Sequence, residues 1–257
     1  MKGVIPVMAA LFFPAARVRQ ADSRESAAWV LEEMRHIEFS AINYDDEADP
    51  YWDYIKGSIP ILISAPHGAK HYRASEGAWK DEDAYTSSLA IVLGRLTGAH
   101  VLYVKNRTRE DPNNDMGTKY KEALKEAVEK NRIGFILDLH GSGGSRPFKI
   151  DIGIMDNSPA RCSCPTFRDI LEKVFADFEP RIFNQRFPAR SGGTITCFAR
   201  NSLGIEAAQV EINANYRIVR SKSTGFETDP ANIVDLTKRL RRVIEAADNR
   251  IGRTTTR

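Results

Sequence analysis

The sequence has 257 residues, with 37 Lys and Arg against 34 Asp and Glu and a formal net charge of +3. Such an even balance argues against nucleic acid or an anionic membrane as the main partner. The length suits one α/β domain with a substantial core. We therefore predict a single domain over residues 1–257, in which residues 1–55 are an N-terminal extension that packs on it and residues 250–257 a disordered tail.

The first residues and the cysteines give indications of the cellular compartment. Met1–Ala16 carries one Lys and an apolar stretch broken by two prolines, and so faintly imitates a secretory signal. Cys162, Cys164 and Cys197 are an odd and small set, which fits a reducing compartment better than a disulfide framework. No stretch approaches the roughly 20 apolar residues of a membrane helix. We expect a cytoplasmic protein without a membrane partner, with export as the alternative; the sequence indicates no oligomeric state.

Hydrophobic periodicity predicts strands that alternate with helices along the whole chain, which is typical of an α/β layered fold. Residues 41–54 and 69–80 are expected to be irregular, and residues 190–196 a turn that passes into a strand or hairpin. Helices are predicted at residues 23–36, after Asp81–Asp83, at 118–130, at 166–178 and from Pro230, and strands from Ile61 and at 99–104, 132–139, 148–155 and 207–213.

Two predicted strands end in a histidine that is followed by glycine, at His67 and at His140. Open α/β sheets place ligands at the carboxyl ends of their strands, so we expect both imidazoles to bind one metal ion there. The alternative is that each histidine merely satisfies a strand-end hydrogen bond, which the paired pattern makes less attractive. Asp138 lies two residues before His140 on the same strand face, where it would hold the second ring nitrogen.

A carboxylate ligand is expected from the acidic triplet that opens the helix after the first histidine. Glu82 is the first choice and Asp83 the alternative, although acidic residues in a first turn also suit the helix dipole. Two histidines and one carboxylate on Zn²⁺ leave the fourth position for water, as in catalytic zinc sites. His71 could supply a third nitrogen if its segment were helical, but the neighbouring glycine and proline indicate a loop.

Two further features complete the predicted chemistry. Glu211 lies between two apolar residues of the last predicted strand, so it faces either solvent or a site, where it could act as general base. Arg107 and Arg109 follow the strand at 99–104 and could form a fork for a substrate carboxylate, with a solvated basic loop as the alternative. The reaction class that follows is metal-assisted hydrolysis of an amide beside a carboxylate.

An ordered series of short motifs between Ile61 and Arg217 resembles the N-formylglutamate amidohydrolase family, which is related in fold to zinc carboxypeptidases and succinylglutamate desuccinylases. The motifs are Ser64-Ala-Pro-His-Gly68, Glu82-Asp83, Asn106-Arg107, Asp138-Leu-His-Gly141, Gly192-Gly-Thr194 and Gln209-Val-Glu-Ile-Asn213. The resemblance implies a zinc-peptidase-like, phosphorylase/hydrolase-like three-layer fold with a mixed, mostly parallel central sheet. It also implies one zinc ion and a small acyl-amino-acid substrate.

The resemblance also implies roles for particular residues. His67 and His140 would be zinc ligands and Glu211 the catalytic glutamate, while Asn106-Arg107 would grip a substrate carboxylate. Thr194 would join the substrate-binding residues.

The sequence departs from this pattern at one position. Carboxypeptidase relatives place a glutamate ligand three residues after the first histidine, and here that position is Lys70. We expect a zinc-dependent enzyme that cleaves the amide of an N-acylated amino acid carrying a carboxylate. The alternatives are a carboxypeptidase or amidase acting on peptides or cell-wall fragments, and a non-catalytic carboxylate-binding homologue.

Overall fold

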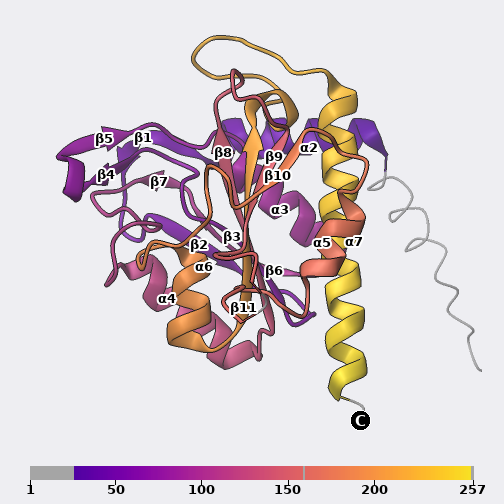
Figure 1. Cartoon of the computed structure of the whole chain (residues 1–257). Coiled ribbons are helices and arrows are strands. Elements are labelled where there is room, and N and C mark those ends of the chain that lie inside the picture. Colours follow the sequence, from indigo (N-terminus) through magenta and orange to yellow (C-terminus); the bar gives the residue numbers. More distant parts are fainter. Residues whose placement is uncertain (1–25, 159, 256–257) are drawn as a thin grey trace, which may run out of the picture.

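A seven-stranded mixed sheet runs through the centre of the computed structural model, which describes residues 26–158 and 160–255 (Figure 1). Four neighbouring strand pairs are parallel and two are antiparallel, so the predicted α/β fold with a mixed, mostly parallel sheet is confirmed. Across the sheet, the strands are β10 (Arg181–Phe183), β9 (Ile150–Gly153), β11 (Glu206–Asn213), β8 (Phe135–Ser142), β3 (Ile61–Ala65), β6 (His100–Val104) and β2 (Trp52–Ile55).

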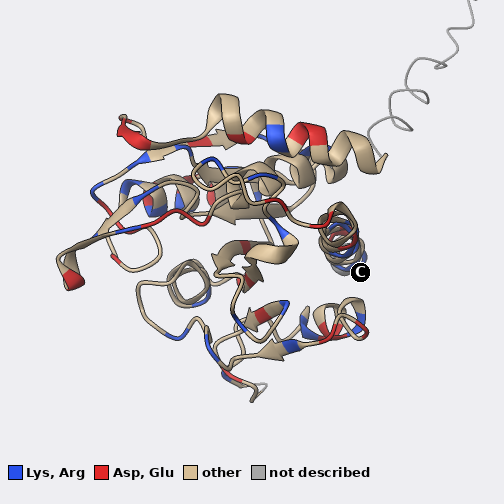
Figure 2. Cartoon of the chain, turned by 90° about the horizontal axis from the view of Figure 1, so that it is seen from above, with Lys and Arg blue, Asp and Glu red and all other residues tan. Residues whose placement is uncertain are grey.

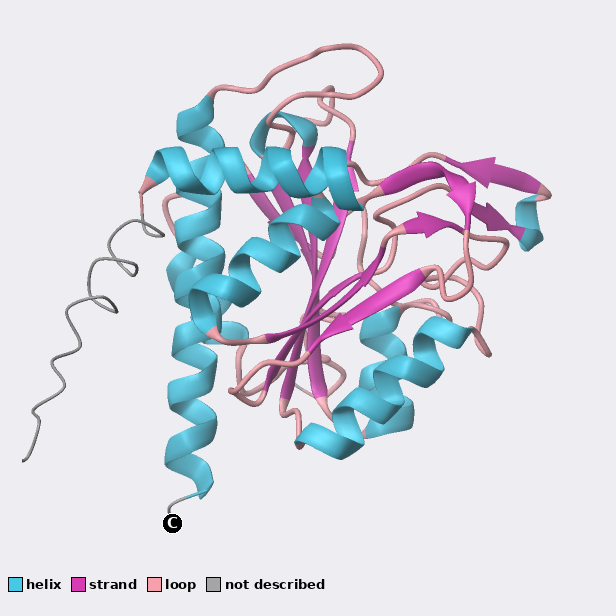
Figure 3. Cartoon of the chain, turned by 180° about the vertical axis from the view of Figure 1, so that it is seen from behind, coloured by secondary structure: helices cyan, strands magenta, loops and turns pink. Residues whose placement is uncertain are grey.

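Helices cover both faces of this sheet and make three layers (Figures 1 and 3). One layer consists of α2 (Ala27–Ala41), α3 (Thr86–Thr97), α5 (Arg168–Val174) and α7 (Pro230–Thr255). The other face carries α4 (Lys119–Asn131) and α6 (Ile195–Phe198). Because β3 and β8 are covered on both sides, their side chains are almost all buried, as in other parallel sheets.

The part of the extension that the structure describes belongs to the domain itself. Strand β2 pairs antiparallel with β6 at the edge of the sheet, and α2 packs on α3 and α7. The expected irregular stretch at 41–54 also contains β1 (Asn43–Glu47), which pairs with β7 (Asn106–Arg107). These short strands lack a strong apolar alternation, so their sequence does not predict them. They form because partners distant in the sequence pair with them. The signal-like stretch at residues 1–16 lies outside the described residues.

Three other segments differ from the sequence-based expectation. Residues 69–80 form a hairpin of β4 (His71–Arg73) and β5 (Ala78–Lys80) rather than an irregular loop. The segment at 190–196 leads into α6, whose N-cap is Thr194: its hydroxyl accepts a hydrogen bond from the Cys197 N–H at 3.2 Å. Helix α7 continues to Thr255, past the position where a tail was expected to begin.

Basic and acidic residues are interspersed along the ribbon of the described chain (Figure 2). None of the helices in the described part of the chain combines the length and apolar character needed to cross a membrane.

Gly68 gives a test of how tightly the loop after β3 is held. A Cβ atom at this position would lie 1.8 Å from Ser87 Oγ in α3 and 2.5 Å from the Val104 carbonyl oxygen in β6, so the loop would have to move away from both elements. We expect Gly68→Ala to lower the free energy of unfolding by about 1–3 kcal/mol through overpacking, measured by urea denaturation. Gly117→Ala is the matched control, because no atom of the described residues lies within 4 Å of its added Cβ; equal losses in the two variants would show that the clash at Gly68 is not the cause.

Candidate metal centre and catalytic cleft

A cleft of about 460 Å³ opens near the carboxyl ends of β8 and β11. Its lining includes His67, Asp83, His140 and Glu211, so the main candidates from the sequence face one space. A larger hollow of about 780 Å³ lies between α2 and the segment at 220–225, but it contains none of these residues. The candidate metal-binding and catalytic residues therefore lie in the smaller cleft.

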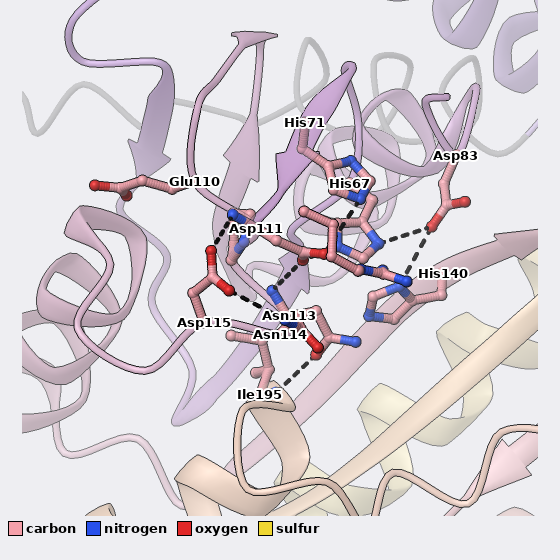
Figure 4. Close-up of polar contacts among 12 residues, drawn as sticks. His67, His71, Asp83, Glu110, Asp111, Asn113, Asn114, Asp115, His140 and Ile195 are labelled. Carbon is pink, nitrogen blue, oxygen red and sulfur yellow. Dashed lines mark hydrogen bonds and ion pairs between the residues drawn. The ribbon is translucent and has the colours of Figure 1, made fainter. Parts of the chain in front are cut away.

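Asp83 lies between two imidazoles in this cleft (Figure 4). Its Oδ2 atom is 3.5 Å from His67 Nδ1 and 3.3 Å from His140 Nδ1. The three donor atoms lie within 4.8 Å of one another, and all three side chains are buried or nearly so. Two imidazole nitrogens and one carboxylate oxygen are a donor set that suits Zn²⁺ and leaves a coordination position open. These residues form a candidate metal site.

Each imidazole also contacts a second carboxylate through its other ring nitrogen, Nε2. His67 Nε2 lies 2.8 Å from Asp111 Oδ1, and His140 Nε2 lies 3.1 Å from Asp138 Oδ2. A carboxylate on one ring nitrogen fixes the tautomer that presents the other nitrogen to a metal, which is the usual environment of metal-binding histidines. Asp138 was expected in this role, whereas Asp111 was not singled out, because its turn-rich segment gave no signal beyond the acidic residue itself.

The imidazoles and carboxylates of this buried site compensate one another's charge. Burial opposes a charge on His67 and on His140, but the carboxylates around them outweigh burial and raise the pKa of both imidazoles. Burial also acts to raise the pKa of Asp83, yet hydrogen bonds to His140 and His67 lower it far below its usual range. A cation between these groups would replace the protons that the imidazoles otherwise retain.

The backbone explains why Asp83 rather than Glu82 reaches the histidines. The Asp83 N–H donates to the His67 carbonyl oxygen at 2.8 Å, which joins the two loops directly. Tyr85 then enters α3 in a left-handed conformation, with a φ of 69°, and its N–H donates to Glu38 at 3.0 Å. The Glu82 carboxylate is outside the donor set, and its Oε2 atom is buried without a hydrogen-bond partner among the described residues.

His71 belongs to a second set of donor atoms, with His67 and Asp111. The rings of His71 and His67 stack with centroids 3.9 Å apart, and burial lowers the pKa of His71 to about 3. However, Arg73 Nε already lies 2.6 Å from Asp111 Oδ2, so a guanidinium supplies the positive charge beside that carboxylate. This arrangement favours His71 as a neutral packing residue rather than as a metal ligand.

Glu211 lies directly beside His140, because the register of parallel strands β11 and β8 pairs the two residues. Residues paired in this way point to the same face, so the Glu211 carboxylate lies next to the candidate metal site. Gln209 Nε2 donates a hydrogen bond to Glu211 Oε1 at 3.0 Å. Burial raises the pKa of Glu211 to about 7 against the attraction of His140, which is a suitable value for a general base at neutral pH.

The arginines expected to bind substrate lie elsewhere. Arg107 and Arg109 both contact Glu47, at 3.3 Å and 3.2 Å, and their guanidinium groups lie over the Trp79 ring. Neither these arginines nor Asn106 are among the residues that line the cleft, whereas Thr194 is. The basic side chains that do line it are Arg73, Lys80, Arg186 and Arg190.

No protein-family model matches this chain, and no curated protein matches it in sequence. Among solved structures, the N-formylglutamate amidohydrolase from Ralstonia eutropha is similar with a TM-score of 0.56 and 18% sequence identity, over 78% of this chain and 98% of that chain. A bacteriophage poly-gamma-glutamate hydrolase is similar with a TM-score of 0.50 and 13% identity, over 80% of this chain and 93% of that chain.

These similarities define the fold. The chain has the zinc-peptidase-like fold that the sequence motifs predicted, and its structural neighbours include the group that the motifs resemble.

Neighbouring carboxylates provide a sharp test of the metal site. We expect Asp83→Ala to weaken zinc binding more than about 100-fold, because it removes one of three donor atoms and leaves two imidazoles. Glu82→Ala, its matched control, should change the affinity less than about threefold. Competition with a zinc-chelating dye measures both. Equal affinities for the two variants would contradict the assignment, and a loss in Glu82→Ala alone would reverse it.

The raised pKa of Glu211 predicts a stability change of defined sign. A carboxyl whose pKa rises on folding stabilises the folded state below its unfolded pKa, 4.5, and loses that contribution as the pH rises through about 7. In chelator-treated protein at pH 8, we expect Glu211→Gln to raise the free energy of unfolding by on the order of 2 kcal/mol. The gain should shrink toward pH 5.

Urea denaturation at the two pH values measures this effect. The exposed Glu129→Gln substitution controls for removal of a surface charge. A gain for Glu211→Gln that is the same at pH 5 and pH 8 would show that its ionised form is not destabilised by burial.

Proposed function

We propose that this protein is a zinc-dependent hydrolase that cleaves the amide bond of an N-acylated amino acid carrying a carboxylate, as N-formylglutamate amidohydrolase does. The observation that carries the proposal is the position of Glu211 beside a set of two histidines and Asp83 in one cleft. His67, Asp83 and His140 would hold the zinc ion. The fold shared with the Ralstonia eutropha enzyme supports the same reaction class.

The residues of the chain have separate tasks in this reaction. A zinc ion bound here would polarise the substrate carbonyl and make a neighbouring water more acidic. Glu211 accepts a proton from the water that attacks the carbonyl carbon, and it then delivers that proton to the amide nitrogen as the C–N bond breaks. The products are the carboxylic acid from the acyl group and the free amino acid. Asp111 and Asp138 keep both imidazoles oriented throughout.

A second candidate is hydrolysis of an amide within a longer acidic peptide. Lys80, Arg186 and Arg190 line the cleft, and a row of basic side chains would attract a chain of carboxylates. The structural likeness to a poly-gamma-glutamate hydrolase favours the same substrate class. The two candidates share the zinc site and the base and differ in how many carboxylates the substrate presents.

Replacement of the base tests the mechanism. We expect zinc-loaded Glu211→Gln to hydrolyse N-formyl-L-glutamate about 10²- to 10⁴-fold more slowly than the wild type, because the amide side chain cannot accept the proton. Its zinc content should remain at the wild-type level, whereas His140→Ala should lose both zinc and activity. Release of free glutamate measures the rates.

Oligo-γ-glutamate assayed in parallel separates the two candidates. Faster turnover of the oligomer at equal concentration favours the peptide substrate. Absence of turnover with either substrate in the zinc-loaded wild type would overturn the proposed function, and full activity of Glu211→Gln would overturn the role of the base.

A further inference from the structure

A buried guanidinium, that of Arg217, lies against Gly141, a residue of the cleft lining, although Arg217 is not itself one of the lining residues. Arg217 is only 5% exposed, and its Nε and Nη1 atoms are buried without a hydrogen-bond partner in the described part of the chain. Among the residues that the structure describes, no ion pair within 4.0 Å involves this side chain, whereas the other deeply buried cation, Lys121, has hydrogen-bond partners. Lys121 Nζ, for comparison, donates to two backbone carbonyl oxygens, those of Pro112 and Asp115.

Such a group is costly to bury. Transfer of an unpaired charge out of water is strongly unfavourable, and arginine cannot avoid the cost by losing its proton. Native structures therefore pair buried guanidinium groups with an anion, commonly a carboxylate in a two-pronged contact. An anion that comes from outside the chain would complete the environment of Arg217.

The backbone holds Arg217 in a defined place. The residue follows β11 by a single 3₁₀ turn (Ala214–Tyr216), in which the Arg217 N–H donates to the Ala214 carbonyl oxygen at 3.3 Å. Asn213 fixes the start of this turn, since its Nδ2 atom donates to Arg146 and Phe148 carbonyl oxygens at 3.1 and 3.0 Å. The guanidinium is thus carried by the end of the strand that carries Glu211.

Gly141 connects the guanidinium to the cleft. It follows His140 in β8 and belongs to the cleft lining. A Cβ atom at Gly141 would lie 2.3 Å from both Nε and Nη2 of Arg217, so the guanidinium occupies the space that any side chain would fill. Arg217 also experiences the negative charges of Asp83 and Glu211 without contacting them. The guanidinium therefore lies against the residue that directly follows His140 in β8.

From this juxtaposition we propose that Arg217 binds a carboxylate of the substrate, the role that the sequence motifs gave to Arg107. The inference rests on the proposed function and deepens it, because it states what selects an acidic acyl-amino acid. Arg107 already shares Glu47 with Arg109, so its charge has a partner within the chain. Arg217, by contrast, has no hydrogen-bond partner for Nε or Nη1 among the described residues, and the 3₁₀ turn before it holds its backbone.

Matched substrates test whether Arg217 is the anchor, that is, the residue that binds a carboxylate of the substrate. N-formyl-L-glutamate is compared with N-formyl-L-glutamine and with N-formyl-L-glutamic acid α-amide, each of which has one carboxylate replaced by an amide. We expect the wild type to lose about 100-fold in kcat/KM with one of these analogues, mainly through KM. Arg217→Ala should lose a similar factor with the parent substrate and discriminate less than about threefold. Arg217→Lys, which keeps the charge without the fork, should recover part of the loss.

Two controls separate anchoring from structure. Arg239→Ala removes a largely buried arginine that already pairs with Asp177 and Asp235, and it should leave kcat/KM and discrimination unchanged. Arg217→Met keeps the apolar bulk without the unpaired charge, and its melting temperature without ligand should equal or exceed that of the wild type. A marked fall in the melting temperature of Arg217→Met would show a structural role and overturn the inference.

Binding of glutarate, measured by titration calorimetry, gives a readout without turnover. We expect Arg217→Ala and Arg217→Met to bind glutarate at least about 30-fold more weakly than the wild type. If the wild type hydrolyses no acyl-amino acid but its glutarate binding depends on Arg217, the proposed function fails and the anchor stands. If hydrolysis occurs and Arg217→Ala keeps wild-type discrimination, or loses kcat equally for all three substrates, the anchor fails.

Discussion

The structure depends on the mutual compensation of charged side chains that are taken out of water at the carboxyl end of the central sheet. Asp83 lies between two imidazoles, and each imidazole has a further carboxylate behind it. Removal of one partner would leave the others buried and uncompensated, which is far more costly than loss of an exposed ion pair. This requirement fixes where three separate loops approach one another, and it also creates a place that a divalent cation can occupy.

A polar network around Glu38 holds the segment that follows Asp83. Glu38 of α2 is fully buried and accepts hydrogen bonds from Tyr44, from Ser88 and from the Tyr85 N–H. These contacts hold the left-handed residue at which α3 begins, two positions after Asp83. The helix that covers the sheet and the carboxylate that faces the metal site are therefore positioned by the same buried glutamate, although neither of them is close to it in the sequence.

Two other ionisable groups at this edge lack the compensation that the histidines have. Burial raises the pKa of Glu211, and Arg217 has no partner for its guanidinium nitrogens among the described residues. Both groups lower the stability of the free protein in their charged forms, and both lie beside the same cleft. Groups that are poorly satisfied in the folded chain are available to bind protons, metal ions or substrate. The pattern of satisfied and unsatisfied charges thus separates the residues that build the site from those that would act in it.

The sequence by itself determined the layered α/β class, the strand that leads to His67, the strand that carries His140, and the position of Asp138 beside the His140 ring. Those features follow from periodicities of two and 3.6 residues and from the geometry of a single strand, which are local properties. Only the tertiary structure decided that Asp83 rather than Glu82 reaches the histidines, that Asp111 supports one of them, and that Arg107 contacts Glu47 while Arg217 lies beside the cleft. Neighbouring carboxylates and scattered arginines look alike in a sequence, because their roles depend on contacts between segments that are distant along the chain.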